Sequence, residues 1–148
     1  MVEVCVFRFV ESRPEYLVLR RSPDEKVYPN LWQIVTGTIG EGERAIDAAF
    51  RECKEETSLA PHQFWVVPHV STFYDYHTDT MVMAPQFAAQ VELGDEPTLS
   101  PEHVTYRWLG YDEARRRLVW PGHRDCLDIV HTYLVGGGEA AKLALISL

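Results

Sequence analysis

The sequence predicts an α/β/α sandwich, in which helices cover both faces of a mixed β-sheet. Segments rich in β-branched and aromatic residues, which are typical of strands, precede and follow one helix-like segment at residues 44–57. Further helix-like sequence comes near the C-terminal end, at residues 112–118 and 123–133. Strands around one central helix, with more helix after them, favour a mixed sheet of the α/β class.

The first strands are predicted from composition and turn residues. Residues 2–10 are β-branched and aromatic, and a turn-like segment after them predicts a hairpin with a second strand at residues 16–19. Residues 22–30 carry two prolines and mixed charge, which predicts a surface loop. A short buried strand is expected at residues 32–35, followed by a glycine-containing loop at residues 37–42.

Residues 44–57 carry the strongest helix signal. The segment contains three alanines and is interrupted by neither proline nor glycine. Apolar residues at helical spacing form the stripe that is expected to face the core, namely Ile46, Ala49, Phe50 and Cys53. Pro61 marks the exit from this helix.

The remaining strands follow the helix. Residues 64–70 and 81–91 are predicted strands joined by a polar, aromatic segment at residues 72–80. Residues 92–101 form an acidic, proline-containing loop, and the alternation in residues 104–109 predicts the last strand.

The whole chain, residues 1–148, is predicted to form a single domain. Its 148 residues suit one domain of ordinary size. A composition of 46% hydrophobic and 24% charged residues excludes disordered and fibrous classes. Three glycines at residues 136–138 interrupt the chain after the last helical segment, and the tail beyond them is expected to be mobile.

Charge and cysteine content limit the possible partners. With 22 acidic and 14 basic residues, the formal net charge of −8 would repel a nucleic acid polymer. No stretch approaches the roughly 20 apolar residues of a membrane span, and the first residues lack the basic region and apolar run of a secretory signal. Three widely spaced cysteines argue against a disulfide framework, so a reducing, cytoplasmic location is expected.

The segment Arg-Glu-Cys-Lys-Glu-Glu at residues 51–56 is the most informative one for function. On a helix, Glu55 and Glu56 lie three and four residues after Glu52, so the three carboxylates share a sector of roughly 100°. Like charges at this spacing repel one another, and a divalent cation such as Mg²⁺, which takes oxygen ligands and substrate phosphates, would neutralise them. The alternative is a solvent-exposed acidic helix face, which is common.

A longer pattern favours the metal site. Gly37, five residues, Glu43, seven residues, and then residues 51–59 resemble the signature of the Nudix (MutT-like) hydrolases, G-x5-E-x7-R-E-U-x-E-E-x-G-U, where U is a bulky apolar residue. The box covers residues 37–59, and Cys53 is an acceptable apolar substitute. Ser58 departs from the expected glycine, which would cap the helix with a positive φ.

The resemblance implies the Nudix-type α/β/α sandwich and a role for each box residue. Glu52, Glu55 and Glu56 would bind Mg²⁺ or Mn²⁺, and one of them would position or deprotonate the attacking water. Gly37 would bring a backbone group close to the metal. Glu43 and Arg51 would form a mostly structural pair, in which the arginine orients a glutamate; an ordinary surface ion pair is the alternative.

A narrower resemblance comes from the flanking segments. Val-Thr-Gly at residues 35–37, Glu-Gly-Glu at residues 41–43 and residues 102–109 are similar to the bacterial dihydroneopterin triphosphate pyrophosphatases, also described as dATP pyrophosphohydrolases. Those enzymes release pyrophosphate from a triphosphate that carries a purine or a pterin.

Residues outside the box are further candidates. Glu102 precedes the last predicted strand, a position where several Nudix enzymes have an additional acidic metal ligand or base. A loop carboxylate without a role in the site is equally compatible with the sequence. Relatives often use an arginine at the end of the second strand to contact base or phosphate. Alternation along a strand sends Arg20 and Arg21 to opposite faces, so only one of them is expected to reach a ligand, and Arg21 is the candidate. A group of ring side chains, expected near Trp32, could stack on a purine or pterin or could simply pack, and it comprises Phe73, Tyr74, Tyr76 and His77. His103 and His123 are expected to be structural.

The sequence therefore predicts a metal-dependent pyrophosphohydrolase. Water would attack a phosphorus atom of a nucleoside triphosphate (dATP-like) or dihydroneopterin triphosphate, giving the monophosphate and pyrophosphate. No covalent nucleophile is needed, and neither a G-x-S-x-G nor a phosphate-cradling G-x4-G-K-[ST] motif is present. The alternatives are a hydrolase of nucleoside diphosphate derivatives, such as ADP-ribose or a dinucleotide, and a Nudix module that binds a nucleotide without cleaving it.

Overall fold

The computed structural model describes residues 1–147, and its centre is one mixed β-sheet. The strands are β1 (Val2–Val10), β2 (Arg13–Arg21), β3 (Trp32–Gln33), β4 (Val35–Gly37), β5 (Gln63–Asp75), β6 (Thr80–Gln90), β7 (His103–Leu109) and β8 (Leu145–Ile146). The helices are α1 (Ala45–Thr57), α2 (Tyr111–Arg117), α3 (Pro121–Ile129), the π-helix η1 (Val130–Leu134) and α4 (Glu139–Ala144).

The strand pairing confirms the mixed sheet. Neighbouring strands follow the order β3-β2-β1-β6-β5-β8, with β4 beside β1 and β7 beside β2. The pair β1 and β6 is parallel, whereas β1 is antiparallel to β2 and β4. A connection that returns parallel to β1 needs a long crossover, and α1 lies within it.

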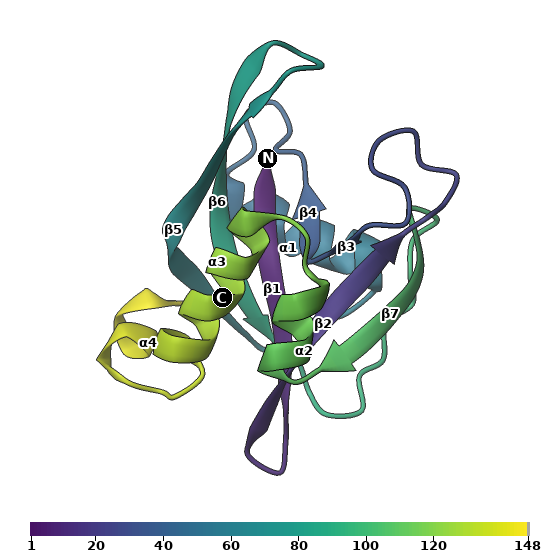
Figure 1. Ribbon diagram of the computed structural model, residues 1–148. Coiled ribbons are helices and arrows are strands. Elements are labelled where there is room, and N and C mark those ends of the chain that lie inside the picture. Colours follow the sequence, from purple (N-terminus) through teal and green to yellow (C-terminus); the bar gives the residue numbers. More distant parts are fainter. Residues whose placement is uncertain (148) are drawn as a thin grey trace.

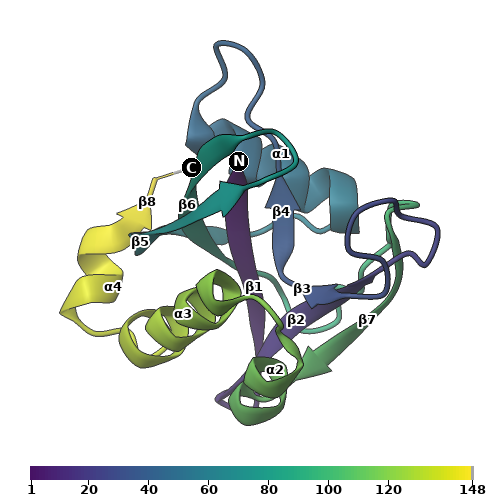
Figure 2. The same ribbon diagram turned by 45° about the horizontal axis from the view of Figure 1, so that its top comes forward.

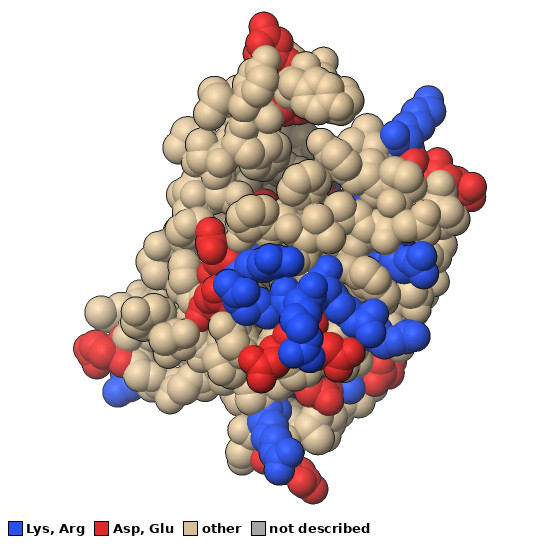
Figure 3. Space-filling model, viewed as in Figure 1, with Lys and Arg blue, Asp and Glu red and all other residues tan. Residues whose placement is uncertain are grey.

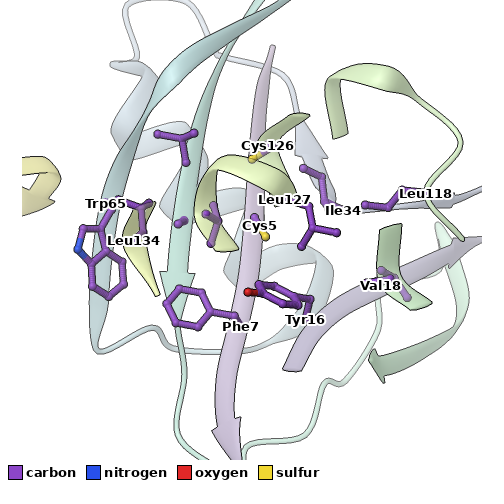
Figure 4. Close-up of a cluster of buried hydrophobic side chains, with 14 of the residues drawn as sticks. Cys5, Phe7, Tyr16, Val18, Ile34, Trp65, Leu118, Cys126, Leu127 and Leu134 are labelled. Carbon is purple, nitrogen blue, oxygen red and sulfur yellow. The ribbon is translucent and has the colours of Figure 1, made fainter. Parts of the chain in front are cut away.

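Helices cover both faces of the sheet, as predicted. α1 lies against one face and α2 and α3 against the other (Figures 1 and 2). Alternation along β1 divides the core, because Val4 and Val6 pack toward α1 while Cys5 and Phe7 pack toward α3. Figure 4 shows the α3-side cluster, in which Phe7 and Tyr16 lie over the sheet. All three cysteines are buried and free.

The predicted central helix is confirmed, and it ends in a left-handed turn although Ser58 replaces the glycine of the signature. α1 ends at Thr57, and Ser58 adopts the left-handed conformation with φ 59°. The backbone N–H of Ser58 donates to the carbonyl oxygen of Lys54 at 2.8 Å. The chain thus forms the turn for which the Nudix signature uses glycine, even though a serine stands there.

The segment at residues 72–80 was expected to join two strands, and this expectation is wrong for most of its length. β5 continues to Asp75 and β6 begins at Thr80, so the two strands form a long hairpin. The extension is paired, with Phe73 opposite Val82 and Tyr74 opposite Met81. Aromatic and β-branched side chains favour a paired strand. The polar residues between them made the segment resemble a loop.

The expectation that the tail after the glycines at residues 136–138 is mobile is also wrong. Gly137 turns the chain with φ 68°, but α4 and β8 follow it, and β8 pairs with β5. The indole N–H of Trp65 donates to the carbonyl oxygen of Ala141 at 3.1 Å, which fixes α4 on the sheet. Residues 139–146 are therefore ordered by contacts with residues far away in the sequence, and residue 148 lies outside the described residues.

Smaller differences concern element boundaries. The strand expected at residues 32–35 is divided at Ile34 into β3 and β4. The helix expected at residues 123–133 begins at Pro121, and its last part is the π-helix η1. Within residues 1–147, none of the helices combines the length and the apolar character needed to cross a membrane.

Candidate active site

Three glutamates of α1 lie along the flank of its buried side and differ in exposure. Ala48, Ala49 and Cys53 pack against the sheet and fix the rotation of the helix about its axis. The side chain of Glu55 is 58% exposed, whereas those of Glu52 and Glu56 are 14% and 5% exposed. The carboxylates therefore extend from solvent into the protein.

Arg51 joins the loop before α1 to two of these glutamates. Its guanidinium contacts both carboxylate oxygens of Glu43 at 2.9 Å, and its Nη1 donates to Glu52 and to Glu55 at 2.8 Å. Arg51 Nη2 also donates to the carbonyl oxygen of Thr38 at 2.9 Å. Hydrogen bonds from Arg51 and from the Gly40 N–H lower the pKa of Glu43 to about 2. The pair is thus a bidentate clamp that orients Glu52 and offsets the repulsion on α1.

Gly37 lies where β4 passes close to the Glu52 side chain of α1. A Cβ at Gly37 would overlap the Cγ and Cδ of Glu52. One residue later, the backbone N–H of Thr38 donates to Glu52 Oε1 at 3.2 Å. Only glycine leaves room for Glu52 at this place.

Glu56 is buried, and one of its oxygens has no hydrogen-bond partner. Within the described residues, Glu56 Oε2 accepts no hydrogen bond. Burial, helped by the charges of Glu102 and Glu52, raises the pKa of Glu56 to about 9, against the lowering effects of the Thr36 N–H and of Arg21. An unpaired carboxyl oxygen inside a protein is costly, so the arrangement suits a cation partner.

The donor set fits a hard divalent cation. Among residues 1–147, no group of three or more His, Cys, Asp or Glu side chains is already placed to hold a metal ion, and Glu52 and Glu55 are paired with Arg51. However, Glu56 offers a free buried oxygen, and carboxylate oxygens are the ligands that Mg²⁺ takes in proteins. Glu52, Glu55 and Glu56 are the residues that would hold such a cation.

Two of the predicted residues outside the box lie near Glu56. The charge of Glu102 acts on the pKa of Glu56, which places this exposed loop carboxylate close to it. Arg21 acts on the same pKa and lies on the α1 side of β2, as alternation predicted, with its guanidinium held by Glu25 at 2.9 Å and the Val27 carbonyl oxygen at 3.2 Å.

The predicted aromatic residues are not brought together. Trp32 lies on β3, and the guanidinium carbon of Arg117 is 5.1 Å from its ring centroid. Tyr74 and Tyr76 lie at the end of the β5–β6 hairpin, away from β3 in both views (Figures 1 and 2). There the Tyr74 hydroxyl donates to Asp79 at 2.9 Å, and the Tyr76 and His77 rings are 3.9 Å apart. The expectation that these rings lie near Trp32 is therefore wrong.

Two polar residues beside Glu56 were missed by the sequence reasoning as parts of this site. His103 Nε2 lies 3.9 Å from Glu56 Oε2, and Gln33 lies behind His103, with its Nε2 at 3.2 Å from His103 Nε2. Burial and the charge of Arg21 lower the pKa of His103 to about 4. The position of His103, directly after Glu102, could have marked it as a candidate site residue. Simple alternation along the strand, however, does not predict that its side chain faces α1.

The raised pKa of Glu56 predicts a pH dependence of stability in the metal-free protein. Its folded-state pKa of about 9 exceeds the ordinary value of 4.5. The contribution of the Glu56 carboxyl to the free energy of unfolding is therefore fully present below about pH 4.5 and is lost as the pH rises through about 9. Urea unfolding in the presence of a chelator should show this decline, and Glu56→Gln should flatten it. A free energy of unfolding with the same pH profile in both proteins would contradict the assignment.

Comparison with known proteins gives the family. Residues 1–128 match the family model of the NUDIX domain. The octanoyltransferase of Myxococcus xanthus is 28% identical over 125 residues, which are 84% of this chain and 34% of that protein. The dihydroneopterin triphosphate diphosphatase of Escherichia coli is 40% identical over 58 residues, which are 39% of this chain and 36% of that protein. The chain spans about a third of the length of these curated relatives.

A solved structure agrees with the fold. The crystal structure of a Caenorhabditis elegans Ap4A hydrolase binary complex matches with a TM-score of 0.74 at 22% identity, over 91% of this chain and 96% of that chain. The family model spans most of the chain, and its match contains all of the box at residues 37–59. This protein therefore belongs to the NUDIX domain family.

Proposed function

We propose that this protein is a Nudix hydrolase that uses a divalent cation, Mg²⁺ or Mn²⁺, to cleave a phosphoanhydride bond. The proposed substrate is a nucleoside triphosphate, dATP-like, or dihydroneopterin triphosphate, and the products are the monophosphate and pyrophosphate. The observation that carries this proposal is the buried, unpaired Glu56 Oε2 next to Glu52 and Glu55 on α1. An acidic helix face that was merely solvated would leave no such oxygen inside the protein.

The residues of the chain divide the work. A bound divalent cation would neutralise phosphate oxygens and lower the pKa of a bound water. Glu52, Glu55 and Glu56 are the residues that would hold that cation, and one of the three would instead accept the proton of the attacking water. Arg51 keeps Glu52 and the loop carrying Glu43 in place. Arg21, on the same side of the sheet, offers a positive charge to a phosphate.

The choice of a triphosphate rests on the relative from Escherichia coli and on the flanking segments. The matched 58 residues of the dihydroneopterin triphosphate diphosphatase are 40% identical to this chain. The likeness to the Ap4A hydrolase, at 22% identity, supports the fold alone. We also propose that residues 1–148 act as a single Nudix domain. Trp32, on β3 beside Gln33, is the ring side chain proposed to contact substrate. Tyr74 and Tyr76, by contrast, lie at the end of the β5–β6 hairpin, away from Trp32 (Figure 1).

A small molecule rather than a nucleic acid polymer is the proposed ligand. Basic side chains gather over α2 and α3, but acidic ones are interleaved with them (Figure 3). Arg115 pairs with Asp128 at 2.8 Å and Arg117 with Glu113 at 3.2 Å, so two of the arginines in this patch are neutralised. Three free buried cysteines suit a reducing compartment, and a cytoplasmic location is proposed on that ground.

The experiment that tests the proposal is a substrate panel with identified products. Purified protein is incubated with Mg²⁺ or Mn²⁺ and with dATP, other nucleoside triphosphates, dihydroneopterin triphosphate, ADP-ribose and dinucleoside polyphosphates. Pyrophosphate together with a monophosphate from a triphosphate is the expected result. If only ADP-ribose or a dinucleotide were cleaved, the substrate class would be nucleoside diphosphate derivatives instead of triphosphates. Tight binding without turnover would indicate a binding module.

A further inference from the structure

An irregularity in β7 turns one histidine toward α1. Along the β2–β7 pair, Arg20 lies opposite Thr105, but Arg21 lies opposite His103 instead of Val104. Val104 is thus the extra residue of a β-bulge, and its side chain is 52% exposed. Without the bulge, alternation would turn His103 to the α2 side of the sheet. With it, His103 lies on the same side as Arg21, and its side chain is fully buried.

The buried histidine closes the space behind Glu56. His103 Nε2 lies 3.9 Å from Glu56 Oε2, beyond hydrogen-bond distance, and 3.2 Å from Gln33 Nε2. Gln33 is itself buried, and its amide reaches the Thr36 hydroxyl at 3.4 Å. His103 and Gln33 are therefore buried together beside the Glu56 carboxylate and leave its Oε2 without a hydrogen-bond partner among the described residues.

The geometry points to His103, supported by Gln33, as a positioning residue that sets the orientation of the Glu56 carboxylate toward a divalent cation. This inference rests on the proposed function. Because the Gln33 amide occupies His103 Nε2, the ring restricts rotation of the carboxyl group without taking its free oxygen. In metal sites generally, groups behind the ligands fix ligand orientation by hydrogen bonds; here the buried ring would do so by packing against the carboxylate.

Cation binding tests the positioning role apart from catalysis. Mn²⁺ affinity is measured by electron paramagnetic resonance and by calorimetry for the wild type, His103→Phe and His103→Gln. Phenylalanine keeps a ring but removes the nitrogen that Gln33 holds, and Mn²⁺ should bind about tenfold more weakly, as for other residues behind a metal ligand. Glutamine can still bond to Gln33, and His103→Gln should recover most of the affinity.

The chain provides a matched control in a second buried histidine–glutamate pair. His123 Nε2 lies 3.5 Å from Glu3 Oε1, and both side chains are about 5% exposed or less. The pair lies between α3 and β1, on the other face of the sheet. His123→Phe should disturb packing to a similar degree, measured as the loss in Tm, and should leave Mn²⁺ affinity unchanged.

Gln33→Met provides a second route should His103→Phe not fold. It removes the amide behind the histidine, and it should weaken Mn²⁺ binding several-fold, with no further effect when combined with His103→Phe. Equal affinity in the wild type, His103→Phe and Gln33→Met would overturn the positioning role and leave the proposed function standing. A wild type that binds no Mn²⁺, with or without a triphosphate, would overturn both.

Discussion

Glu56→Gln is expected to lower kcat/KM with Mg²⁺ by at least about a hundredfold while the protein stays folded. Replacing a residue behind a metal ligand typically lowers metal affinity or activity about 10–100-fold, and replacing the ligand itself should lower activity further. The fold should persist, because the amide has the shape of the carboxyl group and removes the repulsion from Glu102 and Glu52 that raises the pKa of Glu56. Steady-state pyrophosphate release measures the activity, and thermal unfolding measures stability.

Glu55→Gln should show a similar loss for a different reason. The Glu55 side chain is 58% exposed, so little packing depends on it, and a reduced rate would reflect chemistry rather than folding. Glu41→Gln, in the exposed loop before α1, is the matched control and should retain full activity. Unchanged turnover in both Glu55→Gln and Glu56→Gln would reject the proposed site.

Gly37→Ala is expected to cause the second large loss. The new methyl group would overlap the Cγ and Cδ of Glu52, which therefore must move. A displacement of about 1 Å at a reacting group can cost about a hundredfold in rate, and overpacking costs about 1–3 kcal/mol of stability. Both quantities are measurable, as kcat/KM and as the free energy of unfolding in urea.

The control for this substitution is another glycine that has open space around it. No atom lies within 4 Å of a Cβ built on Gly136, so Gly136→Ala should leave activity and stability near the wild-type values. If Gly37→Ala were as active as Gly136→Ala, Glu52 would have no role that depends on its position against β4.

Much of the fold and the box could be predicted because the signals are local. The spacing of Gly37, Glu43 and residues 51–59 is readable without a structure, and alanines with a regular apolar stripe place α1 correctly. Alternation along β2 also separates Arg20 from Arg21 correctly, since side chains on a strand point to opposite faces.

The remaining features depend on partners that are distant in sequence. Helical spacing groups Glu52, Glu55 and Glu56, but it does not show that Glu56 is buried while Glu55 is exposed, because burial depends on β7 and the loop before it. The bulge in β7 inserts one extra residue, Val104, and no local sequence pattern predicts it. Likewise, the tail is ordered by Phe64 and Trp65, about eighty residues earlier.

The division of the core into two separate layers has a consequence for diversification. The buried side chains under α1 and those under α2 and α3 form distinct sets, with only the strands between them. A lineage can therefore exchange residues in one layer while the other stays unchanged. The layer under α1 carries the charged helix, and the opposite layer can change its side chains without altering the packing that holds this helix on the sheet.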